Sequence, residues 1–214
     1  MIEPMRRESS TLVVLVGELG EGLLTELGRS GNVSVARVPA AAAGTGQPGT
    51  TETGSPGPAQ ARPGWEAGAA AMREAAGRQS TYVIVPEDPL AGVASAWRAM
   101  WDVTGPATAA GFEESAAEAL AAWRDKRFEL PDYYLVLARP GGTGPDLYLG
   151  PLRAARQRRV ALAVTGSGDA QATRVRAALR SLEHGPWWPP LDELIDVARR
   201  FYAGGLAETQ AAVG

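Results

Sequence analysis

The sequence predicts a three-layer α/β fold of the Rossmann-like or flavodoxin-like kind, with about five mainly parallel strands and helices on both faces. Two observations predict it. Short, unbroken apolar runs such as LVVLVG at residues 12–17 are typical of strands covered on both faces in a parallel sheet. Segments with apolar residues at helical spacing follow most of these runs, which favours parallel strands joined by helices. With 214 residues, the chain is expected to form a single domain, 1–214.

The first strand–helix–strand unit is expected near the start of the chain. After the strand at 12–17, three leucines recur at helical spacing, a glycine ends the helix, and an alternating strand pattern follows, at Leu23, Leu24, Leu27, Gly28 and 33–38. Residues 40–63 are then rich in glycine, proline, threonine and alanine and contain no large apolar residue. Because such a stretch buries too little surface to offset its ordering entropy, it is predicted to be a disordered loop inserted in the domain.

The remaining elements alternate between helix and strand patterns. Helices are expected at 64–80, 87–102, about 110–127, 169–183 and 191–203, and strands at 81–86, 133–138 and 159–166. Trp97 and Trp123 fall on the apolar faces of their helices. Both are therefore predicted to be core residues.

Composition excludes several classes of function. The chain has no cysteine, so it has no disulfide, thiolate metal site or cysteine nucleophile. His184 is the only histidine, which gives little support to a catalytic triad or a zinc site. The net charge of −3 offers no global attraction to nucleic acid or to an anionic membrane. The apolar run at 12–17 is too short for a signal peptide or a membrane span, so a cytoplasmic protein is expected.

The glycines after the first strand raise the question of a phosphate-binding loop. Their order is Gly17-x-x-Gly20-x-Gly22, whereas a dinucleotide fingerprint needs G-x-G-x-x-G. Glu18 and Glu21 place carboxylates where a pyrophosphate would lie, and no G-K-[ST] follows as in a Walker loop. The glycines are therefore interpreted as residues of a turn.

Two further stretches carry candidate ligand-binding residues. Glu87 and Asp88 follow a predicted strand, where a carboxylate pair suits Mg²⁺ or acid–base chemistry, although Asp88 before Pro89 is also typical of a helix N-cap. Glycines and hydroxyls follow the strand at 159–166 and open a helix, as in an anion site, although Ser167 or Asp169 also suits a cap. The residues of this second candidate site are Thr165, Gly166, Ser167 and Gly168, with Arg139 as a further phosphate ligand.

Trp187 and Trp188 stand between prolines in the stretch GPWWPP, before the last predicted helix. Exposed tryptophans often anchor protein partners, but proline-flanked tryptophans at the edge of a core are a more ordinary explanation. The first hypothesis is a non-catalytic protein-interaction or scaffold module without a cofactor or metal, binding a partner or itself through this segment. The alternative is a sensor of a nucleotide or small phosphorylated ligand, or a Mg²⁺-dependent enzyme, with Glu18, Glu87 and Asp88 at the metal.

Overall fold

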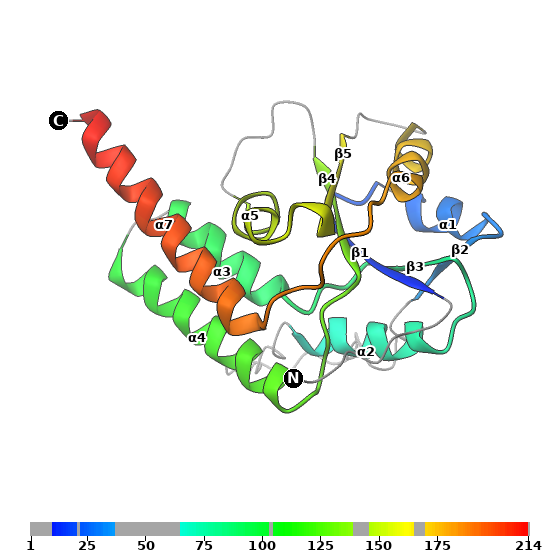
Figure 1. Ribbon diagram of the computed structural model, residues 1–214, viewed down its shortest axis with the longest axis horizontal. Coiled ribbons are helices and arrows are strands. Elements are labelled where there is room, and N and C mark those ends of the chain that lie inside the picture. Colours follow the sequence, from blue (N-terminus) through cyan, green and yellow to red (C-terminus); the bar gives the residue numbers. More distant parts are fainter. Residues whose placement is uncertain are drawn as a thin grey trace, which may run out of the picture.

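A computed structural model describes residues 10–20, 22–36, 65–102, 105–138, 146–164 and 170–213. Its centre is a sheet of parallel strands in the order β2-β3-β1-β4-β5 (Figure 1). The strands are β1 (Thr11–Gly17), β2 (Val33–Val35), β3 (Tyr82–Val85), β4 (Tyr133–Ala138) and β5 (Val160–Val164). The parallel sheet with its helices confirms the predicted three-layer α/β class.

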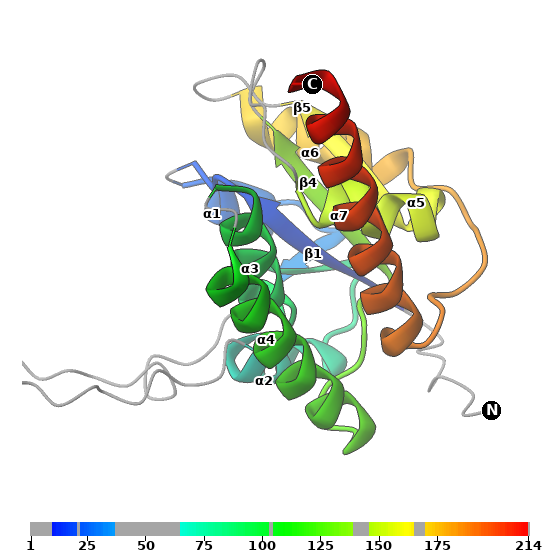
Figure 2. The same ribbon diagram turned by 90° about the vertical axis from the view of Figure 1, so that its left-hand side faces the viewer.

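Helices cover both faces of the sheet (Figures 1 and 2). The α-helices are α1 (Leu23–Gly28), α2 (Trp65–Ala76), α3 (Ala91–Asp102), α4 (Pro106–Arg124), α5 (Arg153–Ala155), α6 (Ala170–Arg180) and α7 (Leu191–Val213). A π-helical turn, η2 (Tyr148–Leu152), precedes α5, and a 3-10 turn, η3 (Gln157–Arg159), follows it. Helices α1 and α6 pack on one face, while α2, α3, α4, η2 and α7 form the larger core on the other.

Alternation along β1 explains how the sheet divides two cores. Leu12, Val14 and Val16 belong to the larger core. Val13 and Leu15 belong to the core beneath α1 and α6. Because successive strand residues point to opposite faces, an unbroken apolar run serves both cores at once.

The strand order creates a switch point beside β1. Strand β1 continues into α1, which lies on the face with the smaller core. Its neighbours β3 and β4 continue toward helices on the face with the larger core. In open α/β sheets, ligands bind where adjacent connections diverge in this way, outside the carboxyl ends of the strands. The order places β3 between β2 and β1, so it differs from both the Rossmann order 3-2-1-4-5 and the flavodoxin order 2-1-3-4-5.

Most predicted elements are present, with shifted ends. The helix expected at 87–102 begins only at Ala91, and the last helix extends from Leu191 to Val213. Trp97 is 1% exposed, which confirms its core position, whereas Trp123 is only partly buried against the larger core. The predicted disordered loop at 40–63 lies outside the described residues.

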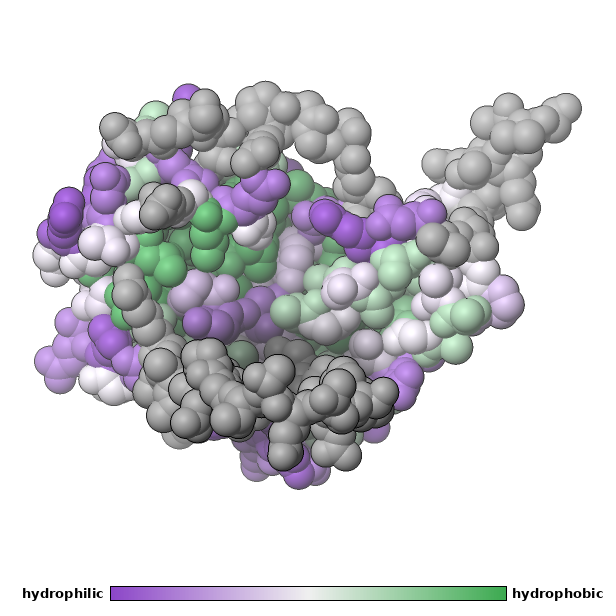
Figure 3. Space-filling model, turned by 180° about the vertical axis from the view of Figure 1, so that it is seen from behind, coloured by the Kyte–Doolittle hydropathy of each residue, from purple (hydrophilic) through white to green (hydrophobic). Residues whose placement is uncertain are grey.

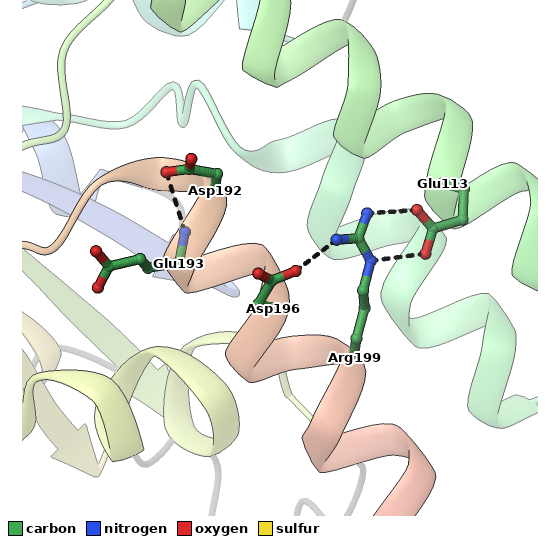
Figure 4. Close-up of polar contacts among 5 residues, drawn as sticks. All are labelled: Glu113, Asp192, Glu193, Asp196 and Arg199. Atoms are coloured by element: carbon green, nitrogen blue, oxygen red, sulfur yellow. Dashed lines mark hydrogen bonds and ion pairs between the residues drawn. The ribbon is translucent and has the colours of Figure 1, made fainter.

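Helix α7 is held to α4 by an ion-pair cluster, drawn in Figure 4. The Arg199 guanidinium donates from Nε to Glu113 Oε1 at 3.0 Å and from Nη2 to Oε2 at 2.6 Å. It also donates from Nη1 to Asp196 Oδ1, one turn earlier on α7, at 2.6 Å. The hydrogen bonds from Arg199 lower the pKa of Glu113. The bidentate ion pair between Arg199 and Glu113 aligns α7 along α4.

Candidate functional site

The loop between β1 and α1 lies at the carboxyl edge of the sheet, beside the switch point. It has left-handed backbone at two glycines, Gly17 with φ 109° and Gly22 with φ 79°. A Cβ on Gly17 would lie 2.4 Å from the Leu137 carbonyl oxygen of β4, whereas a Cβ on Gly22 would meet open space. These glycines therefore serve the turn, as the sequence indicates.

Gly17 and Gly22 have the G-x-x-x-x-G spacing of a phosphate-binding P-loop. The two positions that follow in such a loop are lysine, which reaches the phosphates, and a serine or threonine that binds Mg²⁺. Leu23 and Leu24 occupy them here, and the Leu23 side chain is buried in the smaller core. The loop thus has the glycine spacing of a phosphate loop without the side chains that perform its chemistry.

Gln171 of α6 crosses to this loop. Its Oε1 accepts a hydrogen bond from the Gly20 N–H at 3.1 Å, and its Nε2 donates to the Glu18 carbonyl oxygen at 3.1 Å. A neutral side-chain amide therefore occupies the Gly20 N–H, a donor that an anion bound in this loop would need. Nothing in the sequence pattern identifies Gln171 as a partner of this loop, because the contact spans 151 positions.

The carboxylates expected at this edge have different environments. The fold brings the positions after β1 and β3 to the same edge of the sheet, where Glu18 is exposed, Glu87 is half-buried and Asp88 is buried. Among the described residues, no group of three potential metal ligands is present. Arg139, Thr165, Gly166, Ser167 and Gly168 lie outside the described residues.

Figure 3 shows the molecule from behind, which is the side toward which β1 points. On this side the surface has a hollow lined by hydrophobic residues and bordered by hydrophilic ones.

Asp88 forms a buried cluster with two tyrosines. Its Oδ1 accepts hydrogen bonds from the Leu90 N–H at 3.0 Å and the Tyr134 hydroxyl at 3.1 Å. Its Oδ2 accepts a short hydrogen bond from the Tyr148 hydroxyl. Burial raises the pKa of Asp88 to about 6, although all three hydrogen bonds act in the opposite direction. Burial and the Asp88 charge raise the pKa values of Tyr134 and Tyr148 well above the usual range.

The Asp88 cluster connects three segments of the larger core. The bond to Leu90 closes a turn before α3, and the tyrosines tie this turn to β4 and η2. This agrees with a local backbone role for Asp88, although α3 begins at Ala91, two residues later than a cap at Asp88 would require. The sequence did not indicate the tyrosines as partners. The available signal was a tyrosine within an apolar strand, whose buried hydroxyl needs a partner.

The opposite, amino edge of the sheet holds the Trp187–Trp188 segment. Trp188 is 5% exposed, donates from Nε1 to the Pro131 carbonyl oxygen at 2.7 Å, and packs edge-on against Tyr134. Trp187 is 37% exposed. The structure thus separates the two neighbours, because Trp188 belongs to the core and Trp187 lies at the surface.

Arg159, directly before β5, holds Trp187 in place. Its guanidinium carbon lies 4.8 Å from the Trp187 ring centroid and 5.0 Å from that of Tyr133. The same group donates to three backbone carbonyls, those of Asp132, Gly185 and Pro186. Sequence reasoning missed Arg159, since only its place before a strand marks it. The result is a Tyr133–Arg159–Trp187 stack that fixes the exposed ring.

Comparisons with protein-family models, with curated proteins and with solved structures find no match to this chain. Among the described residues, no helix has both the length and the apolar character needed to cross a membrane.

Proposed function

We propose that this protein is a non-catalytic protein-interaction module and that Trp187 is part of its contact surface. One observation carries the proposal: a large aromatic ring is exposed to solvent while its position is fixed. Trp187 is stacked on Arg159, and its own carbonyl oxygen accepts a hydrogen bond from Arg156 Nε at 2.7 Å. Tryptophan and arginine are enriched among the residues that dominate binding energy at protein interfaces.

Immobilisation strengthens this argument. Association loses free energy when mobile side chains are ordered at the interface. The Trp187 ring is ordered already, since Arg159 is itself held by three backbone carbonyls. A partner that covers the ring therefore gains apolar burial at a small entropic cost.

The β1–α1 loop supports a role without phosphate chemistry. Leu23 and Leu24 replace the phosphate-binding and Mg²⁺-binding side chains, and Gln171 occupies the loop backbone. The glycine spacing alone favours the alternative, a nucleotide or phosphorylated-ligand sensor. The two functions predict opposite results with nucleotides.

A thermal-shift screen with ATP, GTP, sugar phosphates and Mg²⁺ tests the alternative. A ligand at 100 times its dissociation constant stabilises the fold by about 2.7 kcal/mol, which raises Tm by several degrees. We expect no such shift from the wild-type protein. A clear shift that Gln171→Ala increases would instead favour a ligand-binding loop.

Site-specific photocrosslinking tests the interaction surface. A photoreactive phenylalanine analogue at position 187 should form crosslinks to a protein partner or a second copy in the native host. The same analogue at Phe201, which is 46% exposed on α7, is the matched control. Equal crosslinking at both positions, or none at position 187, would contradict the proposal.

A further inference from the structure

We infer that the surface around Trp187 binds an acidic segment of another protein, with an apolar residue of that segment on the Trp187 ring. This inference rests on the proposed function and adds the chemistry of the partner. The surface is formed by Arg156, Arg158 and Trp187 over the buried Arg159, and is called the arginine–tryptophan surface below. It lies at the amino edge of the sheet, away from the β1–α1 loop.

Arg156 and Arg159 bring positive charge to this surface. In the described part of the chain, their hydrogen bonds go to backbone carbonyls: those of Ala155 and Trp187 for Arg156, and of Asp132, Gly185 and Pro186 for Arg159. Carbonyl oxygens satisfy guanidinium donors without cancelling the charge. The Arg156 charge therefore lies beside the backbone of Trp187, and the charge of the buried Arg159 lies beneath its ring.

Arg158 lies at the rim of the surface and adds a positive charge whose ion-pair partner can be replaced. Its Nη1 donates to the His184 carbonyl oxygen at 3.2 Å, and its Nε lies 3.4 Å from Glu183 Oε2. The side chains of this ion pair are 62% and 70% exposed. Such an exposed pair contributes little to stability, so a partner carboxylate can replace Glu183.

The surrounding charges favour a short acidic peptide over nucleic acid. Asp192 and Glu193 are exposed at the start of α7, only a few residues after Trp187 (Figure 4). A phosphodiester backbone carries a negative charge at every nucleotide, so these carboxylates and the net charge of −3 oppose it more strongly than they oppose a peptide with only a few acidic residues. A peptide with a few acidic residues beside one apolar residue can place its negative charges only where they face the arginines.

A displayed random-peptide library, selected on the full-length protein, tests this inference. We expect enrichment of peptides that place aspartate or glutamate beside leucine, proline or an aromatic residue. Binding of the enriched synthetic peptide should weaken roughly thirtyfold in Trp187→Ala and roughly fivefold in Arg158→Glu. It should also weaken as salt rises. Trp187→Phe should recover part of the affinity, because it restores an aromatic ring over Arg159.

Matched variants separate a surface effect from a general one. Phe201→Ala removes another exposed aromatic ring, and Arg98→Glu reverses an exposed charge on α3, so both should bind like the wild type. Circular dichroism melts must show that each variant is folded. Enrichment of neutral or basic peptides, no enrichment, or equal binding by Trp187→Ala would overturn the inference.

Two other outcomes also count against an acidic protein segment. Competition by single-stranded oligothymidylate at lower concentration than the peptide would assign the surface to nucleic acid. Self-association that Trp187→Ala abolishes would assign it to a second copy of this chain. Self-association leaves the proposed protein-interaction module in place, whereas binding of nucleic acid contradicts it. Nucleotide-dependent stabilisation would favour the ligand-sensing alternative to the proposed function and would leave the peptide result intact.

Discussion

The two edges of the sheet differ in how their polar groups are used. At the carboxyl edge, the loop backbone is bound by a neutral amide, Gln171, and Asp88 is enclosed by two tyrosines. At the amino edge, Arg159 keeps its charge among carbonyls and supports an exposed ring. At the edge where α/β proteins usually bind ligands, the Gly20 N–H and the Asp88 carboxylate are thus used in internal contacts, while the opposite edge presents an exposed ring beside arginines.

This difference shows that an α/β fold does not locate its own functional site. A fold supplies positions at which chemistry is often found, and the side chains at those positions decide whether it occurs. Here the residues after β1 retain the geometry of a tight turn, while the segment at 181–190 carries the two tryptophans and the residues at 156–159 carry the arginines beside them. Variants at the two edges therefore test the comparison directly.

The largest expected effect separates the adjacent tryptophans at the amino edge. Trp188→Ala should cost about 3 to 5 kcal/mol of unfolding free energy, because it empties a core site and leaves the Pro131 carbonyl without its indole donor. Trp187→Ala should cost no more than about 1 kcal/mol, since an exposed ring and one cation–π contact are lost. Urea denaturation measures both. Equal losses would remove the distinction between core and surface on which the proposed function depends.

The second prediction concerns pH and the buried Asp88 at the carboxyl edge. Its folded pKa of about 6 exceeds the ordinary value of 3.8, so the folded state binds a proton that the unfolded state has lost between these values. Stability from this group is present below about pH 4 and is lost as pH rises to about 6. The expected loss is about 3 kcal/mol, and it levels off above that pH.

Asp88→Asn isolates this contribution, because asparagine does not titrate. The difference in unfolding free energy between wild type and variant should change by about 3 kcal/mol between about pH 4 and pH 7, against the wild type as pH rises. A pH-independent difference for Asp88→Asn would mean that the carboxylate is solvated rather than enclosed.

The sequence predicted the regular elements far better than the contacts between them. The apolar run at 12–17 matches β1 at Thr11–Gly17, and YYLVLA matches β4 at Tyr133–Ala138, because burial on both faces produces an unbroken local pattern. The position of β3 beside β1, the bond from Gln171 to Gly20 and the stack of Arg159 on Trp187 join distant segments. Local periodicity carries no information about such pairings, so neither the closed loop nor the arginine–tryptophan surface was predictable.

The third prediction compares two glycines of the β1–α1 loop. Gly17→Ala should cost about 2 kcal/mol or more, since it adds left-handed strain and drives Cβ against the Leu137 carbonyl of β4. Gly22→Ala should cost about 1 kcal/mol, because it meets the same backbone strain in open space. Thermal melts of both variants check the order. If Gly22→Ala were the less stable variant, the tighter constraint on the loop would lie at Gly22 and not at Gly17.

The smallest expected effect tests whether the amino-edge surface depends on how α7 is held. Glu113→Gln removes the carboxylate that receives two donors from Arg199, but the groups are about half exposed, so the loss should be only about 0.3 to 1 kcal/mol. Because Glu113 has a lowered pKa, this stabilisation should be present above the ordinary carboxylate range and fade as pH falls through the lowered pKa.

Trp187 should be unaffected by Glu113→Gln, since Arg159 and Arg156 hold it independently of α4. The fluorescence of Trp187, taken as the difference between Trp187-containing and Trp187→Phe forms, should therefore be the same with and without Glu113→Gln. A change in that difference spectrum would mean that the ion-pair cluster and the arginine–tryptophan surface act as one unit, and that the position of α7 controls the contact surface.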